Sequence, residues 1–373
     1  MHITAIRATV LKERVLWARE IETIVTLRAG SRPPGQRAMP WPGSLLVEIE
    51  TDEGMTGVGL GGGGLAGAIA VDHYLMPLLI GDDPLDIERL WELMYRTSYR
   101  YGQAGLMLMA ISGIDLALWD LKGRALGQPV WQLLGGKARE RIPVYATVRD
   151  PVWAQSQGYT GVKLGGPYGP SDGPEGVRKN EAAVAAVRER VGPDFDIMLD
   201  CARTWDVAYT VKMARILAPY GLTFIEEPIA SHDVEGYCRL RRSVHSTLIA
   251  CGEHVYTRYG AARLLSAGAV DIIQPDIRWT GGLSETLKIC DLAAAHDIPV
   301  MPHRGGMAWA LHLIMARSTC TMAEGLALSD DEAEISVFDG EPVPERGCLS
   351  VADSPGFGLT LRTERIPAFL GDI

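Results

Sequence analysis

The feature that most constrains this chain is a set of polar residues that recur at nearly equal intervals in its second half. Each of them ends or directly follows a short apolar run, and successive members lie 26, 27, 23 and 27 residues apart: Asp200, Glu226, Glu253, Asp276 and His303. Amphipathic segments accompany the apolar runs, at residues 178–191, 208–217, 261–267 and 283–295. One strand, one helix and two loops of a parallel barrel need about this length. The spacing therefore predicts repeated βα units closed into a barrel.

The apolar runs are short enough to be buried strands. We expect barrel strands at residues 162–164, 195–201, 223–227, 248–253, 272–276 and 300–303. In a parallel barrel the C-terminal ends of all strands meet at one mouth. Polar residues that lie far apart in the sequence would therefore become neighbours there.

The first part of the chain has the pattern of an α+β domain instead. Residues 3–10 and 45–50 are rich in β-branched and apolar side chains, and residues 51–54 have the composition of a hairpin turn. Helical spacing follows, and it includes a long apolar helix at 106–121 that we expect to end near Gly123.

The length of the chain, 373 residues, exceeds what a single hydrophobic core usually serves. The changes of pattern divide it into three parts. We predict an α+β domain at 1–138, a barrel domain at 139–328 and a C-terminal segment at 329–373 that packs back on the first domain.

Composition disfavours several other classes of protein. The formal net charge of −10 argues against a nucleic-acid-binding surface. No run approaches the roughly 18 apolar residues that cross a bilayer, and the first ten residues lack the features of a signal peptide. The six cysteines occur singly, without a C-x-x-C pair, which is typical of a reducing compartment. We therefore expect a cytoplasmic protein that contacts neither membrane nor nucleic acid.

Three carboxylates end three successive units of the barrel: Asp200, Glu226 and Glu253. Three anions in one mouth repel each other unless a cation lies between them. A hard divalent cation prefers such oxygen ligands, so the sequence predicts a Mg²⁺ site. A single acid of this kind would more often be solvated or cap the next helix, but three in evenly spaced units favour the metal. Strand alternation points only one of Glu226 and Glu227 inward, and the pattern does not decide which.

The next two units end in Asp276 and His303. A neutral histidine accepts a proton near pH 7, and a carboxylate behind it fixes its tautomer and raises its basicity. We therefore interpret His303 with Asp276 as a general base. His254 follows Glu253 directly and could bind substrate, donate a proton or simply belong to the loop.

Two further residues are candidates for stabilising negative charge. Lys163 ends the first expected strand and could place an ammonium against it, and Glu324, about one strand beyond His303, could donate a hydrogen bond if protonated. The glycines at 61–64 are not followed by Gly-Lys-Ser/Thr, so a phosphate loop is disfavoured and a flap or an ordinary turn remains.

At this point the residues resemble a known family, the enolase superfamily, in its mandelate racemase-like branch of acid-sugar dehydratases and most closely its L-rhamnonate dehydratases. The resemblance extends from about residue 44 to the end. It is carried by IDLALWDL at 114–121, LLGG at 133–136, MLDC at 198–201, IEE at 225–227, GEH at 252–254, QPD at 274–276, GGL at 281–283, PH at 302–303, EPVP at 341–344 and PGFG at 355–358.

The resemblance implies a fold and a set of roles. The fold is an N-terminal α+β capping domain over a modified (β/α)8, TIM-like barrel of the (β/α)7β form. The metal ligands fall on Asp200, Glu226 and Glu253, the base dyad on His303 with Asp276, and a further site histidine on His254. Substrate-binding residues fall in the capping loops, here residues 29–43, where Arg32 or Arg37 could clamp a carboxylate. Arg304, a further candidate for substrate binding, departs from the rhamnonate-type pattern.

The expected reaction is that of a hydro-lyase. A Mg²⁺-dependent acid-sugar dehydratase removes the proton at C2 of a sugar acid and eliminates the 3-hydroxyl, giving a 2-keto-3-deoxy acid, with L-rhamnonate or a close relative as substrate. Racemising relatives carry a Lys-x-Lys base where this chain has Lys163-Leu164-Gly165, which favours dehydration.

Two alternatives stay open. One is an epimerase or racemase of a 2-hydroxy acid on the same scaffold, and the other is a non-catalytic, metal-binding member of the fold. The resemblance also implies a homo-oligomer, with an octamer as one form. The expected ligands are Mg²⁺ and a small sugar acid.

Overall fold

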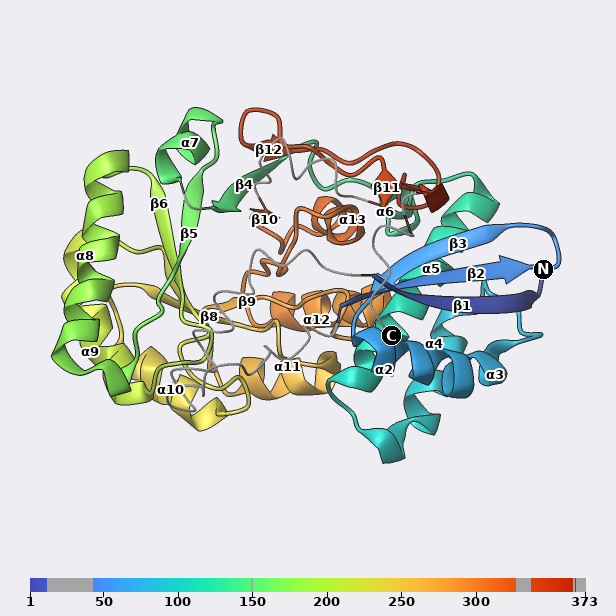
Figure 1. Ribbon diagram of the computed structural model, residues 1–373, viewed down its shortest axis with the longest axis horizontal. Helices are drawn as coiled ribbons and strands as arrows, with labels where there is room; N and C mark the ends of the chain where they lie inside the picture. Colours follow the sequence, from blue (N-terminus) through green and yellow to red (C-terminus); the bar gives the residue numbers. More distant parts are fainter. Residues whose placement is uncertain (12–42, 149, 327–336, 365, 367–373) are drawn as a thin grey trace, which may run out of the picture.

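The computed structural model describes residues 1–11, 43–148, 150–326, 337–364 and 366. Arg32 and Arg37, the two arginines proposed for the capping loops, lie outside these residues. Figure 1 shows a sheet and helices from the N-terminal part on one side of the molecule and a ring of strands and helices from the later sequence on the other.

The N-terminal part is a three-stranded antiparallel sheet covered by helices. Its strands pair in the order of the sequence: β1 (Ile3–Leu11), β2 (Ser44–Thr51) and β3 (Thr56–Gly61). The helices are α2 (Gly64–Ala70), α3 (Met76–Leu79), α4 (Ile87–Thr97) and α5 (Leu106–Leu126), with a π-helical turn at Val71–Leu75. The N–H of Gly54 donates to the carbonyl of Thr51, which confirms the predicted hairpin turn.

Helix α5 is apolar on nearly all sides because the sheet covers one face and the barrel another. The expectation that it ends near Gly123 was wrong, since it continues to Leu126 and Gly127 caps it in the left-handed conformation. Gly123 lies inside the helix, where an added Cβ would be 2.6 Å from the Cα of Gly356. The glycine is therefore needed for close packing, which outweighs its cost of about 1 kcal/mol in a helix.

The later sequence forms the parallel barrel. Its strands are β4 (Ile142–Thr147), β5 (Gly161–Gly165), β6 (Asp196–Asp200), β7 (Phe224–Glu226), β8 (Leu248–Cys251), β9 (Ile272–Ile273) and β10 (Ala323–Leu326). They pair in this order from β4 to β9, and β10 returns to pair with β4. Single bridges from Ile273 to Val300 and from Val300 to Cys320 continue the ring beyond β9.

Seven helices follow the successive strand positions. They are α7 (Pro151–Ser156), α8 (Gly173–Val191), α9 (Val207–Leu217), α10 (Val234–Ser243), α11 (Thr257–Ser266), α12 (Gly282–Ala295) and α13 (Ala308–Ala316), and α6 (Val130–Leu133) links the two parts. With β10 in the eighth position, this is the (β/α)7β barrel that we expected. Within the described ranges, no helix is long and apolar enough to span a membrane.

The six strand predictions were correct in place, but all except the first, which corresponds to β5, extended too far toward the mouth. Strand β8 ends at Cys251, two residues before Glu253, and β9 ends three residues before Asp276. The segment predicted as a strand at 300–303 forms only the bridges of Val300. Strands β4 and β10 were not among the predicted strands.

Side chains that face inward from the strands form a layer below the mouth. This layer is a small apolar cluster of buried residues from six strand positions: Tyr145, Met198, Phe224, Ala250, Ile272 and Met301. Because strand side chains alternate, residues two positions further along point the same way. Asp200, Glu226 and His303 lie two positions after Met198, Phe224 and Met301, so they point to the same side. The apolar layer therefore forms the floor of a polar mouth.

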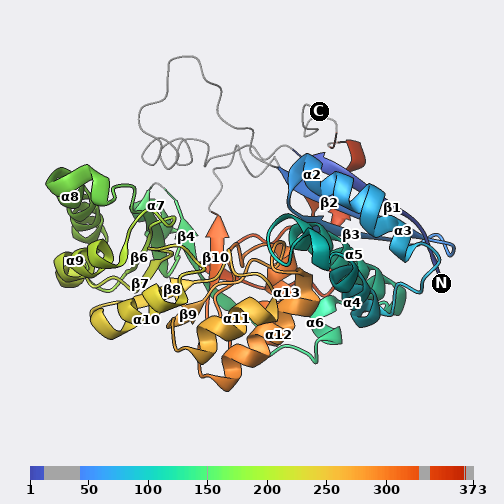
Figure 2. The same ribbon diagram turned by 90° about the horizontal axis from the view of Figure 1, so that it is seen from below.

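Buried hydrogen bonds join the N-terminal domain to the barrel at the start of α12. Asp115 on α5 accepts from the N–H and the hydroxyl of Ser284, at 3.0 and 2.6 Å. The indole of Trp91 donates to the carbonyl of Gly281 at 2.6 Å. Figure 2 shows the N-terminal helices beside α12 and α13. The loop between β9 and α12, which carries Asp276, is thereby tied to the capping domain.

The C-terminal segment contacts both parts. Strand β12 (Cys348–Leu349) pairs with β4, and β11 (Phe338–Asp339) pairs with β13 (Thr360–Leu361). The N–H of Phe357 donates to Asp120 on α5 at 3.0 Å. The boundaries at 138 and 328 stay a prediction.

His312 on α13 is a buried, neutral histidine in the contact between α13 and α6. Its Nδ1 accepts the N–H of Trp131 at 3.0 Å, and 1% of the residue is exposed. Burial lowers the pKa of the imidazole to about 3. The unfolded chain, with a pKa near 6.5, therefore binds a proton between about pH 6.5 and pH 3 that the folded chain does not.

Stability should consequently fall as the pH is lowered through this window. Between pH 7 and pH 4 this single group removes about 3 kcal/mol from the free energy of unfolding. His312→Asn keeps an acceptor for Trp131 and does not titrate, so it should lose that much less over the same range. Urea unfolding of both proteins at each pH measures the difference, and parallel curves for the two would contradict the neutral state of His312.

Candidate active site

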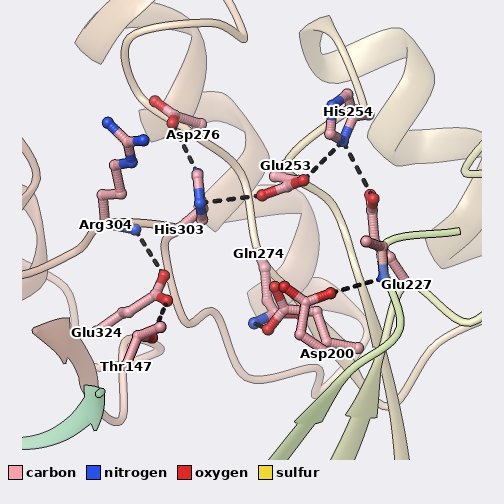
Figure 3. Close-up of polar contacts among 12 residues, drawn as sticks. Thr147, Asp200, Glu227, Glu253, His254, Gln274, Asp276, His303, Arg304 and Glu324 are labelled. Atoms are coloured by element: carbon pink, nitrogen blue, oxygen red, sulfur yellow. Dashed lines mark hydrogen bonds and ion pairs between the residues drawn. The ribbon is translucent and has the colours of Figure 1, made fainter. Parts of the chain in front are cut away.

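The barrel brings the residues predicted from the spacing to one mouth. Asp200 and Glu226 end β6 and β7, and Glu253, Asp276 and His303 lie in the turns just beyond their strands. Register places Asp200 opposite Glu226 in neighbouring parallel strands. Figure 3 shows the side chains of Glu253, Asp276 and His303 gathered above those of Asp200 and Gln274.

Glu226, rather than Glu227, is the glutamate that faces the barrel interior. Lys163 donates to both of its carboxylate oxygens, at 2.8 and 2.9 Å, and Gln274 donates to Oε2 at 2.9 Å. Burial raises the pKa of Glu226, whereas the Lys163 ammonium opposes this shift. The structure therefore settles the ambiguity of the two neighbours, because Phe224 and Glu226 share one side of β7.

His303 lies between two carboxylates. Its Nδ1 is 2.8 Å from Oδ2 of Asp276, and its Nε2 is 3.0 Å from Oε2 of Glu253 (Figure 3). Burial lowers the pKa of the imidazole, but the contacts with Glu253 and Asp276 outweigh it and bring the pKa to about 10. Asp276 is fully buried, and Arg278 and His303 hold its pKa below the usual range against the effect of burial. Asp276 thus holds one nitrogen of the ring and directs the other into the mouth.

His254 and Glu227 form the other end of this chain of contacts. The Nδ1 of His254 is 2.9 Å from Oε1 of Glu253 and 3.1 Å from Oε2 of Glu227. Burial lowers the pKa of His254, and the two carboxylates raise it to about 9. Arg203, which follows Asp200 closely in the sequence, forms ion pairs with both glutamates. His254 therefore faces the site, as the resemblance implies.

Glu324 is held as a carboxylate on the opposite wall. It accepts from Thr147 at 2.8 Å and from the backbone N–H of Arg304 at 2.8 Å, and its Oε1 is 2.7 Å from the ammonium of Lys163. Burial raises the pKa of Glu324, but Lys163 and His303 outweigh this and bring it to about 2. In this arrangement Glu324 accepts hydrogen bonds. We expected it to donate one, and that expectation stays a prediction that these contacts do not favour.

Trp279 connects the two histidines to the capping domain. Its ring centroid is 5.5 Å from that of His254 and 5.5 Å from that of His303. An added Cβ at Gly62 would be 3.1 Å from the indole Nε1. The glycine run at 61–64 is buried and closely packed at this point, which agrees with neither the flap nor the ordinary turn that its sequence suggested.

The donor set fits a hard divalent cation. Asp200, Glu226 and Glu253 offer carboxylate oxygens, which Mg²⁺ prefers. Asp200 accepts the N–H of Ala202 at Oδ1 with a distance of 2.8 Å, and none of the described residues donates to its Oδ2. Burial raises the pKa of Asp200, and the nearby carboxylate of Glu253 raises it further. Such a shift is expected where buried acids lie close to one another.

Several residues that contact the candidate site were not singled out from the sequence. Gln274 and Thr147 each follow an apolar run, but they are neither acidic nor histidine, so the pattern that singled out the acids and His303 passed over them. Arg203 and Trp279 lie in loops, whose path spacing does not predict. Arg304 contacts Glu324 through its backbone, and its role in substrate binding stays a prediction, as do those of Arg32 and Arg37 beyond the described chain.

Comparison with known proteins finds similar proteins over most of the chain. Residues 37–135 match the family model for the N-terminal domain of mandelate racemase and muconate lactonizing enzyme, and residues 148–365 match the enolase C-terminal domain-like model. The chain is 40% identical over 328 residues to an L-rhamnonate dehydratase of Saccharopolyspora erythraea, covering 86% of this chain and 84% of the relative.

Two solved structures are similar over nearly the whole chain. Rhamnonate dehydratase from Gibberella zeae, complexed with Mg, is 36% identical with a TM-score of 0.91, and the match covers 99% of this chain and 96% of that one. A racemase from Streptomyces coelicolor A3(2) with bound magnesium is 28% identical with a TM-score of 0.82, covering 99% of this chain and 100% of that one.

The ligand assignment can be tested by removing one charge from the barrel interior. Glu226→Gln keeps the shape of the side chain but removes an anionic ligand, so Mg²⁺ affinity should fall by at least about 10-fold. Calorimetric titration with Mg²⁺ measures the change, and Glu189→Gln on the exposed face of α8 is the control that should keep the parent affinity. Unaltered affinity in Glu226→Gln would remove Glu226 from the ligand set.

Proposed function

The chain belongs to the mandelate racemase and muconate lactonizing enzyme family of the enolase superfamily, and we propose that it is a Mg²⁺-dependent acid-sugar dehydratase. The observation that carries the proposal is the position of His303, with Asp276 behind Nδ1 and Nε2 directed at Glu253 among the carboxylates. A base beside a cluster of metal-binding acids is suited to removing a carbon-bound proton next to a carboxylate.

Asp200, Glu226 and Glu253 would hold the ion. When bound, Mg²⁺ offsets the second negative charge that develops on the substrate carboxylate as the C2 proton leaves, an effect worth several kcal/mol. Lys163 adds a fixed positive charge to the same wall, because its ammonium lies between Glu226 and Glu324 at 2.8 and 2.7 Å.

His303 carries the proton. The contact with Glu253 is the largest cause of the raised pKa of His303, and it would be lost where Glu253 serves as a metal ligand. The neutral ring then accepts the C2 proton at Nε2, and Asp276 stabilises the imidazolium that results. The imidazolium then returns the proton to the departing 3-hydroxyl, which leaves as water. The water released consists of the 3-hydroxyl and the proton taken from C2. The enol that remains tautomerises to the 2-keto-3-deoxy acid.

The strand opposite His303 favours elimination over racemisation. Racemisation at C2 needs a base on each face of the carbon, and Gly165 ends β5 where racemising relatives carry a lysine. His254 is the other imidazole of the site, but its Nδ1 is held against Glu227 and Glu253. Epimerase activity is therefore the second candidate, and a metal-binding protein without activity is the third.

The substrate is assigned from the relatives. Because the Saccharopolyspora and Gibberella proteins are described as rhamnonate dehydratases, we propose L-rhamnonate or a close six-carbon sugar acid. Arg32, Arg37 and Arg304 are the proposed substrate-binding residues.

We further propose that the protein works in the cytoplasm as a homo-oligomer, with an octamer as one form. All six cysteines are free thiols, which suits a reducing compartment. Light scattering of the purified protein measures the oligomeric state.

Turnover in D₂O tests the reaction. With L-rhamnonate and a panel of related sugar acids, we expect a 2-keto-3-deoxy product, detected by its reaction with semicarbazide, in the presence of Mg²⁺. Deuterium at C2 without loss of the 3-hydroxyl would favour the epimerase instead, and no change in any acid would favour the non-catalytic protein.

The base can be tested separately. His303→Asn keeps a polar group of similar size but cannot accept the proton, so kcat/KM should fall on the order of 10² to 10⁴-fold. His245→Asn is the control, because His245 is exposed just before β8, at the end of the barrel opposite the mouth. Wild-type turnover in His303→Asn would exclude His303 as the base.

A further inference from the structure

Three ligand-bearing side chains lie together beside the proposed Mg²⁺ ligands. Glu227, Glu253 and His254 each offer one atom, and these atoms all lie within 4.8 Å of one another. Such an arrangement is what a cation with two oxygen ligands and one nitrogen ligand would need. Only Glu253 belongs to the ligand set proposed for Mg²⁺.

The guanidinium of Arg203 lies among these three groups. Its Nη1 is 2.8 Å from Nδ1 of His254 and 3.2 Å from Oε1 of Glu253, and it also forms an ion pair with Oε2 of Glu227. One nitrogen atom of Arg203 thus contacts all three potential ligand atoms. This nitrogen carries two N–H groups, which pair with the two carboxylate oxygens, whereas a divalent cation would bind both oxygens and the imidazole nitrogen in its unprotonated form.

The backbone holds Arg203 firmly in this place. Ala202 and Arg203 both have positive φ values, 45° and 63°, which side chains with a Cβ rarely adopt. The N–H of Ala202 donates to Asp200, and the N–H of Arg203 donates to the carbonyl of Glu227 at 2.7 Å. The turn that presents Asp200 to the mouth therefore also directs Arg203 to the three ligand atoms.

The positive charge of Arg203 is paired with the buried carboxylate of Glu227. Glu227 is 1% exposed, so its carboxylate is almost entirely removed from water. A buried carboxylate needs a permanent partner, and a guanidinium does not lose its proton in a protein. Arg203 also engages Oε1 of Glu253 while Oε2 faces His303, which fixes the rotation of that carboxylate.

We propose that Arg203 is a positioning residue that takes the place of a second divalent cation and limits this centre to one ion. The inference rests on the proposed metal ligands, because Glu253 would be shared between the two positions. Without the guanidinium, Glu227, Glu253 and His254 form an acidic pocket that binds a second divalent ion.

Counting bound Mn²⁺ in the full-length protein tests the inference without reference to turnover. We expect one ion in the parent protein and two in Arg203→Ala, measured by calorimetry and by low-temperature electron paramagnetic resonance. Two Mn²⁺ ions that share a carboxylate at the roughly 4 Å typical of two-metal sites couple magnetically and give a spectrum that one ion does not.

Matched variants identify the second position. Arg203→Lys keeps the positive charge and should bind one ion, and Arg203→Ala with His254→Ala removes one proposed ligand and should also bind one. Arg242→Ala, an exposed arginine of α10, is the control for loss of an arginine and should bind one ion. Arg203→Gln keeps the length of the side chain without its charge and should bind two, which covers the case in which the alanine variant does not fold.

The outcomes separate this inference from the proposed function. One ion in both Arg203→Ala and Arg203→Gln, with one in the parent protein, would overturn the role of Arg203 and leave the Mg²⁺ site intact. No bound ion in the parent protein would overturn the metal site itself. Two ions in the parent protein would show that Arg203 does not exclude the second.

Discussion

Repulsion among carboxylates at the barrel mouth is the constraint on which the rest of the site depends. Six acids are crowded there: Asp200, Glu226, Glu227, Glu253, Asp276 and Glu324. In a buried setting each pair of like charges is costly unless cations lie between them. Lys163, Arg203 and Arg278 form ion pairs with these acids. The acids also raise the pKa values of His254 and His303. The acids nearest the centre remain suited to binding Mg²⁺.

The distribution of those charges separates the acids into different roles. Asp276 has a buried arginine beside it and a histidine in front of it, which lower its pKa, and it orients the ring of His303, the proposed base. Glu227 is paired with Arg203 and is turned away from the interior that Glu226 faces. Residues next to each other in sequence thus have different partners, Lys163 for Glu226 and Arg203 for Glu227, because a strand exposes its side chains alternately on two sides.

Much of this was accessible from the sequence, and the limits have physical causes. The intervals between Asp200, Glu226, Glu253, Asp276 and His303 predicted the barrel, since each βα unit has a nearly constant length. The length of the strand predicted at 300–303 was overestimated. An apolar run does not reveal whether its backbone pairs with a neighbouring strand, and here only Val300 forms such bridges. The end of α5 was misplaced because Gly123 signals a stop locally, whereas a contact with Gly356, far along the chain, keeps it in the helix.

The sequence by itself determined the residue types at the strand ends and their order, and therefore the barrel, the acids proposed to bind the metal and the histidine–aspartate pair. Only the tertiary structure decided that Glu226 faces inward, that Arg203 lies among Glu227, Glu253 and His254, and that Trp279 packs against both histidines and Gly62 of the capping domain. The reason is that periodicity records which face of an element is buried. The partner that a loop side chain meets depends on how distant elements close around it.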